Sequence, residues 1–387
     1  MNFNLSKEEL LLGNSVREYI RDRIIPMADA KDREGPLSAE DVREWLTKLE
    51  PFGYIGPLVS ETQQGPGLSH VETGIIFQEL ARGWAALAAI ALSTSSLISM
   101  LMNAGNGSLS SRLLPGLLSG KIIGAVAVTE PGAGTDTTAI AATANLEGDH
   151  YVISADKTWV SNGAVADVVL LAVKVGPLQD DEQSLGYILV EKDQSPFQIQ
   201  EIPKIGLKGL STAQLVLGKC RVPRENLIEV RPRGSRPASH LGASEACLTA
   251  AMAVGITQAA LERSISYVKT RVQFGKVLGQ FQMIQQMISE MATSLEASIL
   301  LCFRALQTLD EGVTASREVA MARSFSTKTA IDVTSKAIQI HGSYGYSDEY
   351  PMERFYRDAC ALSMMGGNPD LQHLQIAEAV TGLGALT

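Results

Sequence analysis

The chain has few of the residues that form covalent cross-links or bind metal ions. Its four cysteines are far apart and make no CxxC pair, a pattern typical of a reducing compartment without a disulfide framework. Its five histidines show no ligand spacing such as HExxH. We therefore expect neither a disulfide framework nor a metal site.

Basic charge and membrane signals are lacking as well. The net charge is −9, which argues against a nucleic-acid-binding protein because phosphate contacts need clustered Lys and Arg. The N-terminal segment carries acids and amphipathic spacing where a signal peptide would have a basic start and an apolar run. The most apolar stretch, Trp84 to Met102, contains five hydroxyl side chains, so we expect a buried helix and no membrane insertion. These absences predict a cytoplasmic protein.

The hydrophobic period changes twice along a chain long enough for two or three domains. Helical spacing runs from residue 5 to about 120 and returns from about 241 to 380. Residues 122–230 form short β-branched runs, and the Pro- and Arg-rich RPRGSRPAS (231–239) reads as a connection. This order predicts an α+β multidomain protein: an N-terminal helical domain (1–121), a central antiparallel β domain (122–232) and a C-terminal helical bundle (233–387).

Two segments of the β region have residues suited to ligand contact. In TEPGAGTD (129–136) the chain leaves a strand and enters a Gly-Pro turn, whose N–H groups could face a phosphate or a flavin edge. A plain surface loop would show the same pattern. In TWVSNG (158–163) a Trp stands beside small hydroxyl residues, where it could stack on a ring system or fill the core.

Two segments of the second helical region are also candidates. We expect RVQFGKVLGQFQ (271–282) to lie inside a helix, with its Arg, Phe and final Gln roughly on one face. That face could hold a pyrophosphate, or it could be a solvated stripe with one buried Phe. In QIHGSYGYSDEYPMERFYRDA (339–359), Gly342 and Gly345 interrupt a helical pattern, which permits close backbone approach to a ligand or marks a helix break.

Together, in this order, the four segments resemble the acyl-CoA dehydrogenase family. GLKGLSTAQLVLGKCRVPRENLI (206–228) resembles the segment that closes the family's β domain, and the resemblance covers nearly the whole chain. It implies FAD bound between helical domains and a small β domain, in a homodimer or homotetramer. It also implies FAD contacts from Val128, Thr129, Gly134, Thr135, Trp159, Val160, Ser161 and Asn368, and, toward the FAD of a neighbouring subunit, from Arg271, Phe274, Gln282, Gln339, Gly342 and Ser343.

The resemblance further implies a carboxylate that removes the α proton of an acyl thioester while the β hydrogen leaves as hydride to flavin N5. In most members this Glu follows a YRDA segment, in a pattern close to Y-E-G-T. Counting from Tyr356, the Glu position holds Gly366. Met365 precedes it, and Gly367-Asn368 replaces the Gly-Thr pair. Glycine cannot take a proton, so the usual base is absent.

A second placement of the base occurs in members that resemble isovaleryl-CoA dehydrogenase or prolyl-carrier-protein dehydrogenase. There the Glu lies ten residues before a glycine on another helix, as Glu245 lies ten residues before Gly255 here. The alternative role for Glu245 is a solvated acid in the first turn of a helix, favoured by the helix dipole. Because the usual Glu is lost where this one is gained, we interpret Glu245 as the base.

The resemblance therefore implies FAD-dependent α,β-dehydrogenation of an acyl thioester. Ala246 stands where CoA-using members often carry Arg, so the acyl group could be carried by CoA or by an acyl carrier protein. Met365 and Gly366 are candidate pocket residues, although methionines there could simply pack the core. The reduced flavin would pass its electrons to an electron-transfer flavoprotein or to oxygen. Two alternatives stay open: a flavin-dependent oxidase or monooxygenase on the same fold, or a catalytically silent flavoprotein.

Overall fold

The first part of the chain is helical in the computed structural model, which describes residues 5–176, 184–231 and 242–384. Ser6 and Ser69 each begin a helix with a capping box, exchanging hydrogen bonds with Glu9 and Glu72. The helical prediction for residues 5 to about 120 is confirmed. The helices are α1 (Lys7–Tyr19), α2 (Ile25–Glu34), α3 (Ala39–Leu49), α4 (His70–Asn103) and α5 (Gly107–Leu118).

Helix α4 is broken at Trp84, whose φ of −154° and ψ of 102° are not helical. Such a break removes helical hydrogen-bond partners nearby, and the Gly83 carbonyl instead accepts hydrogen bonds from the Arg354 guanidinium at 3.4 Å. Among the described helices, α4 and α6 (Ala243–Thr270) are long and apolar enough to cross a membrane, but most of each apolar window is buried inside the protein. This confirms the prediction of a buried helix over Trp84 to Met102.

The middle of the chain forms an eight-stranded sheet in the order β6-β7-β3-β2-β4-β5-β8, with β1 beside β4. The expected antiparallel β domain is confirmed apart from the pairs β1·β4 and β2·β4, which are parallel. A long excursion through the β2–β3 hairpin separates β1 from β4, and such a crossover permits parallel pairing. The strands are β1 (Gly124–Ala127), β2 (Thr143–Glu147), β3 (His150–Ser161), β4 (Val168–Val175), β5 (Ser184–Glu191), β6 (Gln198–Glu201), β7 (Thr212–Pro223) and β8 (Leu227–Arg231).

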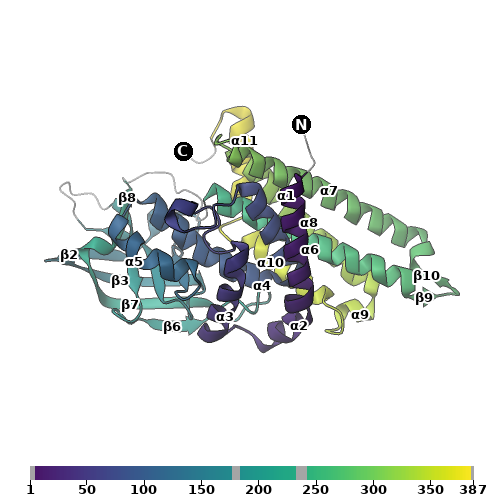
Figure 1. The fold of residues 1–387 in the computed structure, drawn as a ribbon, viewed down its shortest axis with the longest axis horizontal. Coiled ribbons are helices and arrows are strands. Elements are labelled where there is room, and N and C mark those ends of the chain that lie inside the picture. The colour runs from purple at the N-terminus through teal and green to yellow at the C-terminus, as the bar shows by residue number, and fades with distance from the viewer. Residues whose placement is uncertain (1–4, 177–183, 232–241, 385–387) are drawn as a thin grey trace.

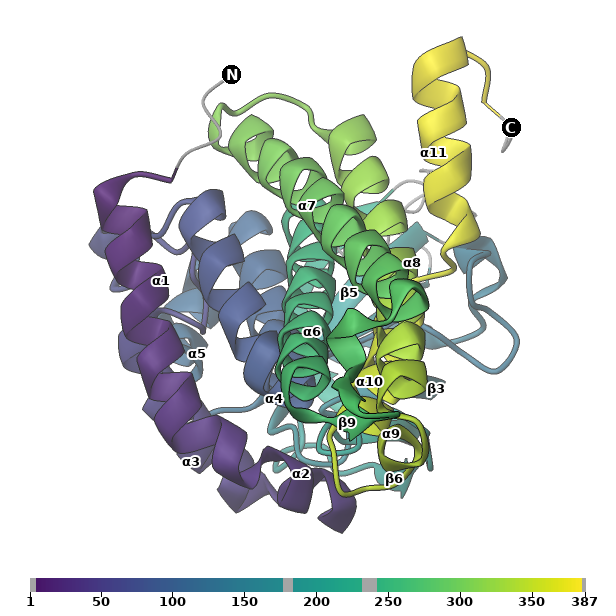
Figure 2. The ribbon, with the colours of Figure 1, turned by 90° about the vertical axis from the view of Figure 1, so that its right-hand side faces the viewer.

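Helices return after β8, as the periodicity predicts. The predicted connection RPRGSRPAS lies outside the described residues, except for Arg231 at the end of β8. Helix α6 packs against both α4 and α8, and Figure 2 shows α6, α7 and α8 side by side. Gly342, with φ of 60°, ends α8, which agrees with the helix break that was one of its two expected roles. The remaining helices are α7 (Gln282–Asp310), α8 (Ser316–His341), α9 (Ser343–Tyr346), α10 (Met352–Met364) and α11 (Asp370–Thr381).

The prediction of a helix through residues 271–282 is wrong. The chain leaves α6 and forms a small hairpin from β9 (Val272–Gln273) and β10 (Lys276–Val277) before α7 begins. Phe274 and Gly275 make its turn, with φ of 50° and 76°. Positive φ at both central residues is what a two-residue hairpin turn requires, and glycine at the second position supplies it. Figure 1 shows this hairpin at the opposite end of the molecule from the sheet.

Candidate functional site

A buried ion pair joins the predicted loop 129–136 to Lys157, the residue just before the second predicted segment (158–163). The carboxylate of Glu130 accepts hydrogen bonds from the Lys157 Nζ at 2.7 Å and from the backbone N–H groups of residues 141–142. Burial acts to raise the pKa of Glu130, but these hydrogen bonds outweigh it and the pKa is lowered. The Thr158 N–H donates to the Thr129 carbonyl at 2.9 Å. The loop TEPGAGTD is therefore anchored against β3, beside Trp159.

The side chain of Trp159 lies on the surface of the β domain. It is 58% exposed, and its φ of 58° is a strained conformation for a bulky residue. The pairing of β3 with β7 shifts register between Lys157 and Val160, and a bulge of this kind re-aims a side chain. Val160 is buried, whereas Gly134 and Thr135 of the loop are exposed. The core role for Trp159 is excluded, and its ring is available to a planar ligand.

Three predicted contacts lie at the far end of the helical bundle. Arg271 follows α6, Phe274 at the hairpin turn is 94% exposed, and Gln282 begins α7. The Arg271 Cζ lies 5.7 Å from the ring centroid of Tyr344 in α9, a distance typical of a cation–π contact. The hairpin is thus close to the α8–α9 junction, which carries the predicted contacts Gln339, Gly342 and Ser343. Within one chain, the β9–β10 hairpin lies at the opposite end of the molecule from the sheet (Figure 1).

Glu245 lies in the first turn of α6 and is 7% exposed. Its neighbours from Ala246 to Thr249 are buried as well. A Cβ on Gly242 would lie 2.4 Å from the Glu245 Oε2, so the carboxylate folds back over the start of the helix. Within the described residues, no hydrogen bond or ion pair reaches this carboxylate. At 7% exposure, Glu245 is not the solvated acid of the alternative role.

After α10 the chain turns at Gly366 and Gly367, which have φ of 78° and 122°. The Arg323 Nη2 donates to the carbonyl of Met365 and, at 3.3 Å, to that of Gly367. In a trans peptide the N–H group points opposite to the carbonyl, so the N–H groups of Gly366 and Asn368 point away from Arg323. Neither N–H group has an acceptor among the residues that the structure describes.

Arg323 and Lys157 are site residues that the sequence reasoning missed. Both had a signal in the pattern. Lys157 alternates with Ile153 and Ala155 on the buried face of β3. Arg323 is one charged residue on an otherwise small and apolar helix face, whose members at helical spacing are Val319, Ser326, Thr327 and Ala330.

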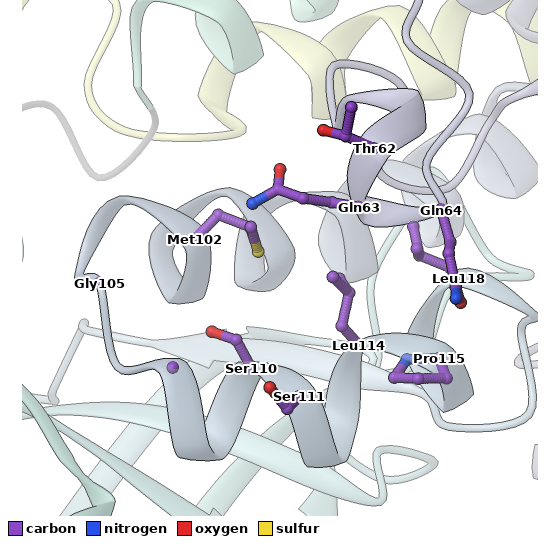
Figure 3. A pocket seen from close by; sticks show the side chains of 11 residues that line it. Thr62, Gln63, Gln64, Met102, Gly105, Ser110, Ser111, Leu114, Pro115 and Leu118 are labelled. Atoms are coloured by element: carbon purple, nitrogen blue, oxygen red, sulfur yellow. The ribbon is translucent and has the colours of Figure 1, made fainter.

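Two clefts in the described surface lie away from the predicted residues. One, of about 460 Å³, opens between residues 62–64, the end of α4 and α5 (Figure 3). Its lining side chains, among them Gln63, Ser110 and Leu114, carry no charge. The other, of about 240 Å³, lies between α2, α4, α6 and α10. Neither is lined by a predicted site residue.

Three domain models of one family match the chain. They describe the acyl-CoA dehydrogenase N-terminal domain over residues 6–121, the middle domain over 125–220 and the C-terminal domain over 234–381. Curated proteins similar to the chain include benzylmalonyl-CoA dehydrogenase of Aromatoleum aromaticum, at 34% identity over 98% of this chain and 100% of the relative. Glutaryl-CoA dehydrogenase of Desulfococcus multivorans is 32% identical over 97% of both chains. Mitochondrial isovaleryl-CoA dehydrogenase of Pongo abelii is 29% identical over 97% and 89%.

Solved structures show the same similarity over the full length. The prolyl acyl carrier protein oxidase AnaB has a TM-score of 0.89 and 26% identity, covering 98% of this chain and 100% of that one. The FAD complex of PigA has a TM-score of 0.88 and 26% identity, covering 98% and 99%. The order of a helical, a β and a second helical region is thus shared along nearly all of the chain.

Proposed function

Because the chain belongs to the acyl-CoA dehydrogenase family, whose members are FAD-dependent CH–CH oxidoreductases, we propose that Glu245 is the base of its acyl-thioester dehydrogenation. The observation that carries this assignment is the burial of the Glu245 carboxylate at the start of α6, where no described residue gives it a hydrogen bond or an ion pair. Hydrogen bonds and ion pairs stabilise a carboxylate and weaken it as a base. Glu245 receives none from the described residues.

The turn after α10 supplies donors for the substrate. When the α proton leaves, negative charge develops on the thioester carbonyl oxygen, and N–H groups fixed at that oxygen stabilise the charge. The N–H groups of Gly366 and Asn368 lack acceptors within the described chain and are held in place from behind by Arg323. We assign these two N–H groups to the carbonyl oxygen. Met365 and Gly366 then border the acyl group.

The residues of the β domain fit the cofactor of the family. FAD supplies the acceptor for the hydride that leaves the β carbon. An exposed Trp159 offers a ring for stacking, and the anchored loop beside it offers hydroxyl and N–H groups. We assign the flavin side of FAD to this surface, with contacts from Val128, Thr129, Gly134, Thr135, Trp159, Val160, Ser161 and Asn368.

A second copy of the chain completes the cofactor site in this proposal. In one chain, the β9–β10 hairpin lies at the opposite end of the molecule from the sheet that carries Trp159 (Figure 1), and Phe274 in its turn is almost fully exposed. A guanidinium suits a pyrophosphate because it binds two oxygens at once. We assign the partner-facing contacts to Arg271, Phe274, Gln282, Gln339, Gly342 and Ser343, which requires at least a homodimer, and a homotetramer satisfies the same need.

The carrier of the acyl group is CoA or an acyl carrier protein. Relatives of both kinds are similar to the chain, as the names of glutaryl-CoA dehydrogenase and the prolyl acyl carrier protein oxidase state. Ala246 follows Glu245, so the Arg that CoA-using members often carry immediately after this Glu is missing from that position of the sequence. We propose a cytoplasmic enzyme whose electrons pass to an electron-transfer flavoprotein.

Anaerobic flavin spectra test the proposal. Purified protein is mixed with a panel of acyl-CoAs and of acyl carrier proteins while the flavin absorbance is followed. Bleaching with one class identifies the carrier and establishes the reaction. A flavin that stays oxidised with every thioester would leave a catalytically silent flavoprotein, and rapid reoxidation by oxygen with hydroxylated product would indicate a monooxygenase.

A further inference from the structure

Arg323 lies at the centre of the contacts that shape the turn after α10. It is 2% exposed, and its Nη2 donates to the carbonyls of Met365 and Gly367. The Gln372 amide is oriented with its oxygen toward Arg323, and this oxygen accepts a hydrogen bond from the Arg323 Nη1 at 3.1 Å. The Gln372 amide nitrogen then donates to the Pro369 carbonyl at 2.8 Å. One guanidinium therefore ties the turn to the start of α11.

Within the described part of the chain, no carboxylate balances the charge of this guanidinium. Its three partners are neutral, its Nε has no partner, and the described residues contain no ion pair with Arg323. Burial lowers the pKa of Arg323 to about 10, with no opposing contribution from an acid. A buried cation without a counter-charge costs stability, and an apolar residue of similar size would avoid that cost. The position thus needs an explanation beyond packing.

The turn itself has little stiffness of its own. Gly366 and Gly367 are adjacent, and glycine populates many backbone conformations with nearly equal ease. Both are held at positive φ, while Arg323 fixes the carbonyl on either side of Gly366. Without these two hydrogen bonds, the peptide planes would rotate and the N–H groups of Gly366 and Asn368 would lose their direction.

We propose that Arg323 is a positioning residue for the oxidation step. By fixing the carbonyls of Met365 and Gly367, it aims the N–H groups of Gly366 and Asn368 at the thioester oxygen. Its charge also polarises these peptide groups, because hydrogen-bonded chains strengthen one another. The inference rests on the proposed function, since it requires a thioester whose carbonyl lies against this turn.

The test compares Arg323→Met and Arg323→Lys in the full-length FAD-loaded protein. Arg317→Met is the matched control, because Arg317 lies on the same helix, is half-exposed and pairs with Glu318. The probe is the 3-thia analogue of the acyl thioester that bleaches the flavin. It cannot be dehydrogenated, but it loses its α proton, and the resulting anion gives a long-wavelength absorption band beside the flavin.

We expect Arg323→Met to reduce kcat by about 10- to 100-fold, since removal of one oxyanion donor costs roughly 100-fold or more. KM should change far less, because the interaction strengthens only as charge develops. The pH midpoint for ionisation of the bound analogue should rise by about one unit or more, each unit being a tenfold change in acidity. Arg323→Lys should fall between wild type and Arg323→Met, and Arg317→Met should match wild type.

A wild-type midpoint in folded, FAD-loaded Arg323→Met would overturn the inference. If that variant does not fold, Arg323→Lys decides in the same way: a raised midpoint supports positioning and an unchanged midpoint removes it. Failure of the proposed function looks different. In that case the wild-type protein neither bleaches with thioesters nor ionises the analogue, and no variant can be compared.

Discussion

The Lys157 ammonium and the Glu130 carboxylate meet at 2.7 Å in the interior of the β domain, directly behind the loop assigned to FAD. Both side chains are buried, so removing one leaves the other as an uncompensated charge. We expect Lys157→Met to lower the free energy of unfolding by about 3–5 kcal/mol and to reduce the bound flavin. Urea unfolding and the ratio of flavin to protein absorbance measure the two effects. Lys48→Met, which breaks a surface pair with Glu44, should cost less than about 1 kcal/mol.

Glu245→Gln tests the base directly. The amide has the size of the carboxylate but cannot accept the α proton, so kcat should fall by about three orders of magnitude or more while FAD stays bound. Stopped-flow reduction of the flavin by the acyl thioester is the measurement. Glu296→Gln, an exposed acid on α7, is the control and should be unaffected. Near-wild-type flavin reduction in Glu245→Gln would remove the assignment.

Returning a Glu to the family's usual position should not restore activity. The double variant Glu245→Gln/Gly366→Glu places a carboxylate at a residue whose φ is 78°. A side chain in the left-handed region costs roughly 1–2 kcal/mol, and the turn would move to avoid that cost. We expect less than about 1% of wild-type kcat, because the loss of a general base typically reduces the rate by at least this factor. Recovery of most of the activity would show that the turn tolerates a side chain in this conformation.

Arg271→Ala should weaken the retention of FAD. Arg271 is the cation among the six residues assigned to the FAD of the partner subunit. A charge-assisted hydrogen bond to a pyrophosphate is worth roughly a tenfold or larger change in affinity. Gel filtration at low protein concentration, followed by the flavin-to-protein ratio, measures the loss. Arg263→Ala is the matched control, since Arg263 is exposed on α6. Equal flavin content in both variants would argue against a partner-supplied cofactor site.

Asp358 should make the protein less stable as the pH rises toward neutrality. Burial raises the pKa of Asp358 to about 7, and the negative charge of Asp32 acts in the same direction. The charge of Arg354 and the hydrogen bond from the Leu207 N–H lower the pKa, but their effect is smaller. The folded state then binds more protons than the unfolded state between about pH 4 and 7, so the free energy of unfolding falls as pH rises through this window. We expect Asp358→Asn to flatten the dependence in urea unfolding at several pH values. If the free energy of unfolding of Asp358→Asn changed with pH as steeply as that of the wild type, other groups would be the cause of the pH dependence.

Most of the architecture follows from periodicities that are visible in the chain. The helical and β regions were predictable because their apolar residues follow the pattern of the element they form. In α4 and α6 these residues form long buried helical segments, and in β3 buried residues alternate with more exposed ones. The hairpin at 271–282 was not, because Val272, Val277 and Phe281 fit a helix as well as two short strands. Only the Phe274-Gly275 step distinguishes the alternatives, since glycine favours the second position of a tight turn.

The site was less predictable than the fold. The spacing of Glu245 from Gly255 singled out the carboxylate, but periodicity could not show that its side chain is buried. The surface position of Trp159 depends on a bulge against β7. Arg323 acts on a turn in another helical segment. These relationships arise from tertiary contacts, whereas the sequence pattern reports only which face of each element is apolar.

The break in α4 at Trp84 has a consequence for the order in which the molecule is made. The Gly83 carbonyl is buried and depends on Arg354, which is 271 residues further along the chain. The carboxylates of Asp29 and Asp32 likewise accept hydrogen bonds from Arg354 and Arg357, respectively, each 325 residues further along the chain. While the nascent chain is still emerging from the ribosome, these polar groups have no internal partner and stay hydrated. The helices translated first are therefore expected to complete their packing last, when α10 is released.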